Sequence, residues 1–170
     1  MSISMMQASV EVFVPYLGNL AALLDRAAEH AEHRRIDPAV LLNMRIAPNM
    51  FNLARQVCEA NRHVMLGCAL LAGQPTPAVL ESEADMAELK RRIGATIDYI
   101  KGLPEAAIEA SAEREVVFAF RNGATRAFTG RSLLLTFTLP QFFFHVTTAY
   151  DIMRHAGVEL IKKDFLGQLR

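Results

Sequence analysis

The stretch that decides the fold is Gln141-Phe142-Phe143-Phe144-His145-Val146-Thr147-Thr148-Ala149-Tyr150. It is a nearly uninterrupted apolar and aromatic run with a single imidazole inside it, that of His145. A helix that is apolar on all sides belongs in the middle of a protein. A histidine buried there needs a partner, because an unpaired buried polar group costs about 1–3 kcal/mol. The run therefore predicts a central helix, and the partner of His145 becomes the main question about function.

The helix that carries this run is expected over Arg131–Ala156, with a kink at Pro140 and Gly157 as its C-cap. Its three consecutive phenylalanines, Phe142 to Phe144, point in different directions around the helix and cannot all face one core. We expect one of the rings to meet a second subunit, a hairpin or a pocket, with core packing as the leading account of the others.

Three further helices are predicted upstream from apolar residues that recur at helical spacing. The second should break near Arg45–Pro48, with its main part over Asn49–Leu71, because the residue before a proline avoids helical geometry. Asp37 is expected to cap this helix, and Ser82 or Asp85 the third. The three predicted helices span Ser4–Glu32, with Pro15 inside it, Pro38–Ala72 and Asp85–Lys101.

The periodicity then changes, which predicts a small β-hairpin. Two β-prone runs, Glu115–Phe120 and Thr125–Phe128, flank the dipeptide Asn122-Gly123, and Asn-Gly between such runs is a strong hairpin signal. Four helices with a hairpin before the last describe an all-α fold, a four-helix bundle, as one domain over residues 1–170. The tail Val158–Arg170 is expected to be partly ordered.

Composition excludes several classes of protein. The 18 basic and 18 acidic residues give zero formal net charge, which argues against nucleic-acid binding and allows self-association, so we expect a homodimer. No run reaches 18 apolar residues, and the N-terminus does not resemble a signal peptide, so neither a membrane span nor secretion is expected.

Cys58 and Cys68 lie ten residues apart on one predicted helix, too far for a disulfide. They fit small buried hydrophobes in a reducing cytoplasm, with a redox role as the lesser alternative.

Three motifs resemble a bacterial family. They are Ser2–Val10 (SISMMQASV), Ile46–Phe51 (IAPNMF) and Phe144–Tyr150 (FHVTTAY), and the resemblance extends through Lys163–Gly167 (KDFLG). The family is an uncharacterised domain of unknown function within the DinB/YfiT-like superfamily. The resemblance implies a four-helix bundle that is often dimeric. It also implies a divalent metal held by three histidines, one from the second helix and an H-x-x-x-H pair from the last, which some members use to activate a thiol.

The sequence offers an incomplete version of that metal site. His63 and His145 stand where two ligands are expected, but Ala149 replaces the third histidine. Glu59 lies one turn before His63 and could complete the site or orient the imidazole. Two histidines and a carboxylate can hold zinc, nickel or iron. The alternative is a pair of core histidines bonded to hydroxyls or carbonyls, for which Thr148 is a neighbour. Because the third histidine is missing, we favour this second reading.

Other polar residues have structural explanations by default. His155 should not share the site, and its position is explained by the favourable interaction of a cationic residue with the C-terminal end of the helix dipole. His30 and His33 should be solvated. Tyr99 and Tyr150 could serve as proton donors, although bonds to loop carbonyls are the commoner role. Arg55, Glu59 and Arg62 could bind an anion, but i, i+4 pairing on a surface is the usual explanation.

Two functions follow from these residues. The first is a DinB-like bundle protein that lacks the complete three-histidine metal site and binds a small ligand or a partner. The alternative is a metal-dependent enzyme that resembles a thiol transferase and uses His63 and His145, with Glu59 or a water as a further ligand. The sequence leaves open whether the protein is an enzyme.

Overall fold

The computed structural model describes residues 3–78 and 85–168 of the chain. Most of these residues are helical, and two short strands form one antiparallel sheet. The helices are α1 (Met5–Ala8), α2 (Val10–Arg34), α3 (Pro38–Asn43), α4 (Leu53–Leu71), α5 (Met86–Lys101), α6 (Glu105–Glu109), α7 (Gly130–Leu133), α8 (Leu139–His155) and α9 (Lys162–Leu166). The strands are β1 (Glu115–Ala119) and β2 (Thr125–Thr129), and a π-helical turn, η1 (Leu134–Thr138), joins α7 to α8.

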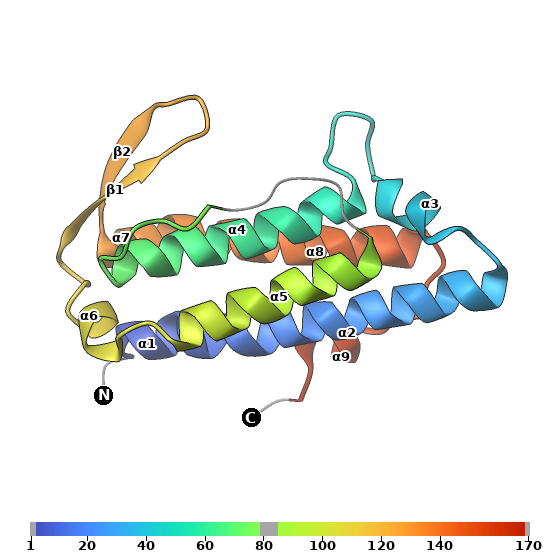
Figure 1. The fold of residues 1–170 in the computed structure, drawn as a ribbon, viewed down its shortest axis with the longest axis horizontal. Coiled ribbons are helices and arrows are strands. Elements are labelled where there is room, and N and C mark those ends of the chain that lie inside the picture. Colours follow the sequence, from blue (N-terminus) through green and yellow to red (C-terminus); the bar gives the residue numbers. More distant parts are fainter. Residues whose placement is uncertain (1–2, 79–84, 169–170) are drawn as a thin grey trace.

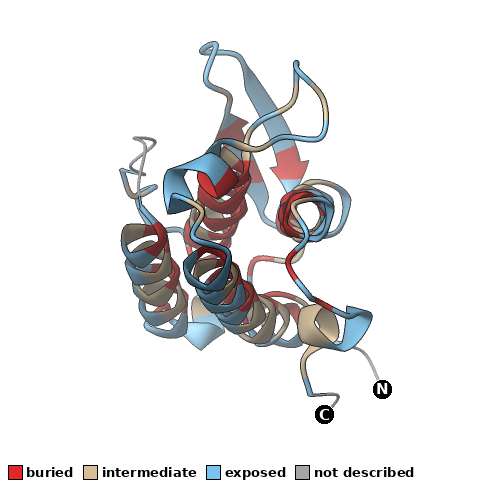
Figure 2. Cartoon of the chain, turned by 90° about the vertical axis from the view of Figure 1, so that its right-hand side faces the viewer, coloured by how far each residue is buried: buried red, intermediate tan, exposed pale blue. Residues whose placement is uncertain are grey.

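The long helices α2, α4, α5 and α8 run side by side (Figures 1 and 2). α4 packs along α8 on one side and α5 on the other, and α2 packs against α5. Their inward faces are apolar and almost fully buried, as the spacing of leucines in α2 predicts. Leu17, Leu20 and Leu24 of α2 are all 0% exposed. This arrangement places the middle of α4 against the middle of α8, where the polar residues discussed below meet.

The predicted helices are present, with shifted boundaries. The first is split at Ser9, so that α1 is a separate turn capped by Ser4, and Pro15 lies inside α2. The predicted break in the second helix is confirmed but is wider than expected, because α3 ends at Asn43 and α4 starts only at Leu53, capped by Asn52. Asp37 and Asp85 cap α3 and α5 as predicted. The alternative cap, Ser82, lies outside the described residues.

The last predicted helix is divided into α7, η1 and α8. A π turn widens the helix by one residue and is a common cause of helix irregularity. Pro140 follows directly in α8, and because the chain is already helical from Gly130, its missing N–H lies inside a continuous helical run. The irregularity predicted from Pro140 is therefore present, but it lies in the turn before the proline. Gly157 ends α8 with a φ of 89°, in the left-handed region that favours glycine.

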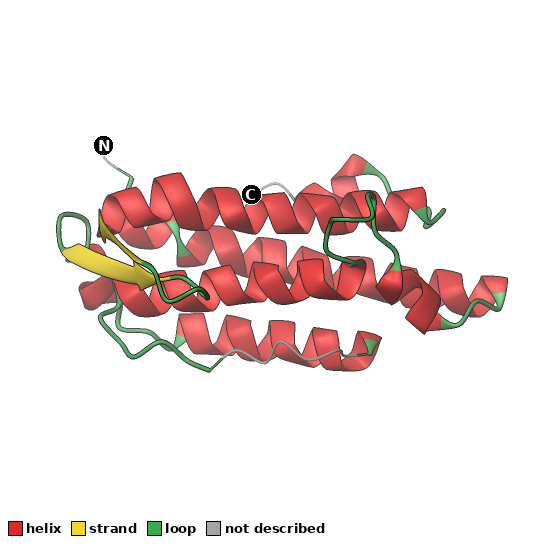
Figure 3. Cartoon of the chain, turned by 90° about the horizontal axis from the view of Figure 1, so that it is seen from above, coloured by secondary structure: helices red, strands yellow, loops and turns green. Residues whose placement is uncertain are grey.

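The predicted hairpin is confirmed in place, and the structure adds its register. Val116 pairs with Phe128 and Phe118 with Arg126, and the Arg121–Ala124 turn connects the strands. Phe118 and Phe128 are the deeply buried aromatic rings of the two strands, while Val117 is 50% exposed. The hairpin lies at the end of the molecule that also holds α6 and α7 (Figures 1 and 3).

Two helix ends are completed by side chains from far along the chain. The Glu109 carboxylate on α6 accepts hydrogen bonds from the backbone N–H groups of Met5 (3.2 Å) and Met6 (2.9 Å) in α1. The Arg114 guanidinium donates to the carbonyls of Leu70 (3.0 Å) and Leu71 (2.6 Å) at the end of α4. These bonds satisfy backbone groups that a helix end leaves without partners. The short helix α6 itself was not predicted.

The expectation of an all-round buried last helix is only partly correct. Phe142 is fully buried against Phe13, at 5.1 Å between ring centroids, and Phe143 packs edge-on against Tyr16 at 4.9 Å. Phe144, in contrast, is 55% exposed. The face of α8 that carries Phe144 is therefore exposed on the single chain. Within the described residues, no helix is long and apolar enough to cross a membrane.

Candidate functional site

Glu59, His63 and His145 meet in the interior between α4 and α8. Each offers a ligand atom, and these atoms lie within 4.8 Å of one another. Glu59 is 2% exposed, His63 7% and His145 5%. These are the three residues that the sequence predicted as a possible metal site, so the structure does bring them together.

Helical geometry accounts for this convergence. Glu59 and His63 are four residues apart, so they occupy one face of α4. His145 comes from the α8 face that packs along α4. The two imidazole rings are stacked, with centroids 5.5 Å apart and an angle of 13° between their planes. Two helices thus place two nearly parallel imidazoles beside one carboxylate.

The partner of His145 is Gln56, which the sequence analysis did not identify. His145 Nδ1 lies 2.7 Å from Gln56 Oε1, and Gln56 Nε2 donates to the Phe51 carbonyl at 3.2 Å. Since the amide NH₂ faces Phe51, the atom that faces the imidazole is an oxygen, which only accepts. Nδ1 must therefore carry the hydrogen, and Nε2 is left with its lone pair available. Thr148, expected as a possible partner, instead donates to the Phe144 carbonyl at 2.7 Å.

The other imidazole, His63, has mainly aromatic surroundings. The Phe137 ring meets it edge-on, with centroids 5.7 Å apart. Its Nδ1 is buried and has no hydrogen-bond partner among the described residues. Native proteins rarely leave a buried polar atom unsatisfied, and such an atom often marks a position for a water or an ion.

Both imidazoles are held neutral. Burial is the main cause that lowers the pKa of His63 to about 3, and the charges of His145, Arg62 and Arg121 lower it further. Burial likewise lowers the pKa of His145 to about 4, with Arg121 and Arg55 acting in the same direction and Glu59 opposing them. A neutral imidazole is the form that binds metals and accepts protons.

The Glu59 carboxylate lies within an ion-pair network. Its Oε1 is 2.8 Å from Arg55 Nε and also accepts from Arg121 Nη2, while Arg62 Nη1 lies 3.9 Å from Oε2. The predicted pairing of Arg55 and Arg62 with Glu59 is therefore present, but its predicted surface location is wrong, because the carboxylate is buried. Arg121 comes from the hairpin turn, and no local sequence pattern linked it to Glu59.

The remaining predicted candidates lie away from this group. His155 is exposed at the end of α8, His33 is exposed on α2, and His30 is half-buried near the same end of α2. Tyr99 is half-buried and its pKa is raised, mainly by burial. Tyr150 packs against Phe165, at 5.9 Å between ring centroids.

The two cysteines behave as buried side chains. Cys68 is fully buried, and burial raises the pKa of its thiol to about 12. Burial also raises the pKa of Cys58, although the nearby Arg92, whose Nη1 lies 3.7 Å from the sulfur, opposes that effect. A raised pKa disfavours the reactive thiolate, so both thiols fit the predicted packing role.

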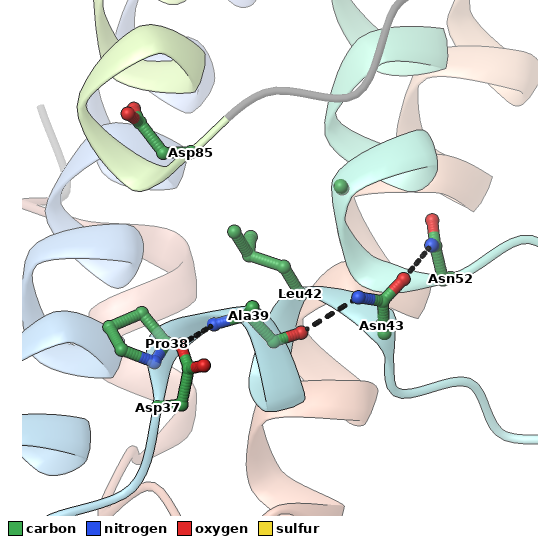
Figure 4. A pocket seen from close by; sticks show the side chains of 8 residues that line it. Asp37, Pro38, Ala39, Leu42, Asn43, Asn52 and Asp85 are labelled. Atoms are coloured by element: carbon green, nitrogen blue, oxygen red, sulfur yellow. Dashed lines mark hydrogen bonds between the residues drawn. The ribbon is translucent and has the colours of Figure 1, made fainter.

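A separate cavity of about 490 Å³ lies beside α3 and the first turn of α4 (Figure 4). Asp37 and Asp85 line it, but each carboxylate also caps a helix, accepting from Ala39 N at 2.9 Å and from Glu88 N at 2.7 Å. The acidic groups of this cavity therefore have structural roles. The buried Glu59, His63 and His145 group does not line it and remains the stronger candidate site.

These features define a helical protein with a buried group of one carboxylate and two imidazoles. Residues 5–166 match the family described as a domain of unknown function, DUF1993, and the chain belongs to that family. The crystal structure of a DinB family member protein from Shewanella denitrificans is similar to this chain, with 38% identity and a TM-score of 0.87. That match covers 95% of this chain and 91% of the other. The DinB-like family predicted from the sequence motifs is thus confirmed. The search of curated proteins found no match.

Proposed function

We propose that this protein binds one divalent metal ion through His63, His145 and Glu59. The observation that carries the proposal is the set of bonds around His145. Gln56 fixes the Nδ1 hydrogen and so leaves the lone pair of His145 Nε2 available, on a ring that has a ligand atom within 4.8 Å of those of Glu59 and His63. Metal-binding histidines generally donate their other ring N–H to an oxygen in this way.

The chemistry of the residues supports a metal. Both imidazoles are neutral, and His63 Nδ1 is a buried nitrogen with no partner among the described residues. Glu59 takes the role of the third histidine, for which Ala149 offers no ligand atom. A carboxylate has about four lone-pair directions, so guanidinium contacts to Glu59 leave acceptor capacity. Two imidazoles and one carboxylate suit zinc or nickel.

We further propose a reaction class to test first, which is thiol transfer by an enzyme that uses His63 and His145. A metal with three protein ligands can lower the pKa of a bound thiol or water and so supply a nucleophile at neutral pH. The residues of this chain would hold that centre in a buried setting, with Gln56 orienting one imidazole.

The second candidate function is a non-catalytic protein that binds a small ligand or a partner. The observation that favours it is the ion-pair network, because Arg55 and Arg121 both contact Glu59 Oε1 and so compete with a cation for this oxygen. In this case the histidines orient a ligand or complete the core.

Elemental mass spectrometry on untagged protein separates these functions. The metal proposal predicts one zinc or nickel ion per chain, lost in His63→Ala and in His145→Ala. The matched control is His33→Ala, which removes an exposed imidazole and should keep the ion. If purified protein carries no stoichiometric metal, and if zinc, nickel and manganese leave its melting temperature unchanged, the metal proposal is wrong and the second candidate stands.

We also propose the wider setting of the molecule. Residues 1–170 would form one domain, a DinB/YfiT-like four-helix bundle with an inserted hairpin, in a bacterial cytoplasm. The exposed Phe144 ring supports a homodimer, because dimer interfaces are enriched in aromatic side chains. Light scattering would give twice the chain mass, and Phe144→Ser would reduce it to one chain mass. A monomer in both samples would reject the dimer.

A further inference from the structure

The β1–β2 hairpin contacts the candidate site through a charged residue in its turn. Arg121 Nη2 donates to Glu59 Oε1, and the two residues are 62 positions apart in the sequence. The Arg121 side chain is 40% exposed, whereas that of Glu59 is only 3% exposed. The ion pair thus links the surface to the buried carboxylate.

An aromatic cluster forms the second contact. Phe118, Phe120 and Phe128 all meet the Phe137 ring, with centroids 4.7, 5.9 and 5.7 Å away. Phe137 in turn meets the His63 ring. The aromatic side chains of the hairpin therefore cover the ring that covers one of the two imidazoles.

The candidate site is closed in this arrangement. With Glu59, His63 and His145 between 2% and 7% exposed, an ion or ligand reaches their atoms only if a neighbouring element moves. The hairpin is the element that opens at least cost, because a two-stranded sheet is marginal alone and Phe128 is the sole buried side chain of β2.

We propose that the β1–β2 hairpin is a lid over the candidate site, that Arg121 is the latch that holds it on Glu59, and that access to His63 and His145 requires this latch to open. The identity of the incoming group, a divalent cation, rests on the proposed function, but the lid itself does not. Arg121 is a positioning residue here, because it acts through Glu59.

Chemical modification of the histidines tests the lid without any metal. Diethylpyrocarbonate reacts with neutral, accessible imidazoles, and peptide mass spectrometry gives a rate for each histidine. In Arg121→Gln the rates at His63 and His145 should rise by about fivefold, the factor expected from a partly exposed ion pair. His33, which is exposed in the wild-type protein, should react at the same rate in both.

Arg126→Gln is the matched control, because Arg126 lies in β2 over the Phe128 ring, at 5.0 Å from its centroid. It should leave the His63 and His145 rates unchanged, and Arg121→Lys should stay close to wild type. In the wild-type protein, higher salt should raise both rates, since salt screens a partly exposed ion pair.

Equal rates in the wild-type and Arg121→Gln proteins would overturn the lid, as would an equal rise in Arg126→Gln, which would indicate general loosening. Zinc added to the same samples gives a separate readout, because bound metal should protect both histidines. If zinc protects neither histidine while Arg121→Gln still raises the rates, the metal proposal fails and the lid stands.

Discussion

The two halves of α4 differ although they belong to one continuous helix. The first half, from Leu53 to His63, buries four polar side chains. They are Gln56, Glu59, Asn61 and His63. The second half, from Val64 to Leu71, buries only apolar side chains and Gly67. The same neighbour, the segment that runs from η1 into α8, packs against both halves.

The difference shows two ways of using one helix interface. In the second half the Thr138 side chain packs directly against the α4 backbone at Gly67, where a Cβ would lie 2.5 Å from Thr138 Cγ2. In the first half, polar groups occupy the interior, and Gln56 bonds to His145 while Asn61 donates to the Val57 carbonyl of its own helix. Burying such groups reduces stability unless they are paired. The first half of α4 therefore contributes less to stability than an apolar half would, but it carries the side chains that can bind an ion or accept a proton.

Glu59→Gln should produce the largest loss in this comparison. It removes the buried negative charge that Arg55 and Arg121 contact, and breaking a buried pair costs about 3 kcal/mol at the lower end of the usual range. Urea unfolding would measure the free energy of unfolding. Glu88→Gln is the control, since Glu88 also pairs with two arginines, Arg91 and Arg92, but its side chain is 28% exposed against 3% for Glu59, so its loss should matter less. Equal losses in the two variants would mean that the carboxylate of Glu59 is not buried as described.

Gly67→Ala should come next, with a loss of about 2 kcal/mol from overpacking against Thr138. Its control is Gly94→Ala in α5, where a new Cβ meets nothing within 4 Å. That variant should gain about 0.5–1 kcal/mol, because alanine favours helices over glycine. Thermal unfolding of the two variants should therefore shift in opposite directions, and a stabilised Gly67→Ala would contradict the close approach.

Acid should have a smaller effect than either substitution when it is counted per histidine and per pH unit. The folded pKa values of His63 and His145, about 3 and about 4, lie below the unfolded value near 6.5, so the unfolded chain binds more protons below pH 6.5. The contribution of the two neutral histidines to the free energy of unfolding is therefore fully present above pH 6.5. It decreases as the pH falls below 6.5, by up to about 1.4 kcal/mol per pH unit for each histidine. Urea midpoints at pH 7 and pH 5 would measure the change, which His63→Leu should reduce. Identical midpoints at both pH values would contradict the neutral imidazoles.

Much of the fold could be predicted because its signals are local. The hairpin turn at Asn122-Gly123 and the helix starts at Asp37 and Asp85 are each determined by residues that are close together in the sequence. The π turn and α6 could not be predicted, because neither has a local signature that distinguishes it from an ordinary helix or loop. Both depend on how distant segments pack.

The residues of the candidate site also divide into those that local sequence patterns predict and those that depend on tertiary packing. Glu59 and His63 follow from helical spacing, and the aromatic run identified His145. Gln56 lies three residues before Glu59 on the same helix face, so the spacing rule could have found it. Arg121 could not have been found, because its pairing with Glu59 exists only once the hairpin folds onto α4.

The two helix ends completed from a distance bear on the order in which the chain folds during synthesis. Residues 1–100 leave the ribosome with the start of α1 and the end of α4 still lacking Glu109 and Arg114. Until those residues emerge, both ends rely on water for their hydrogen bonds and fray. The segment just before the hairpin therefore completes both helix ends before α8, the helix that packs along α4, has been translated.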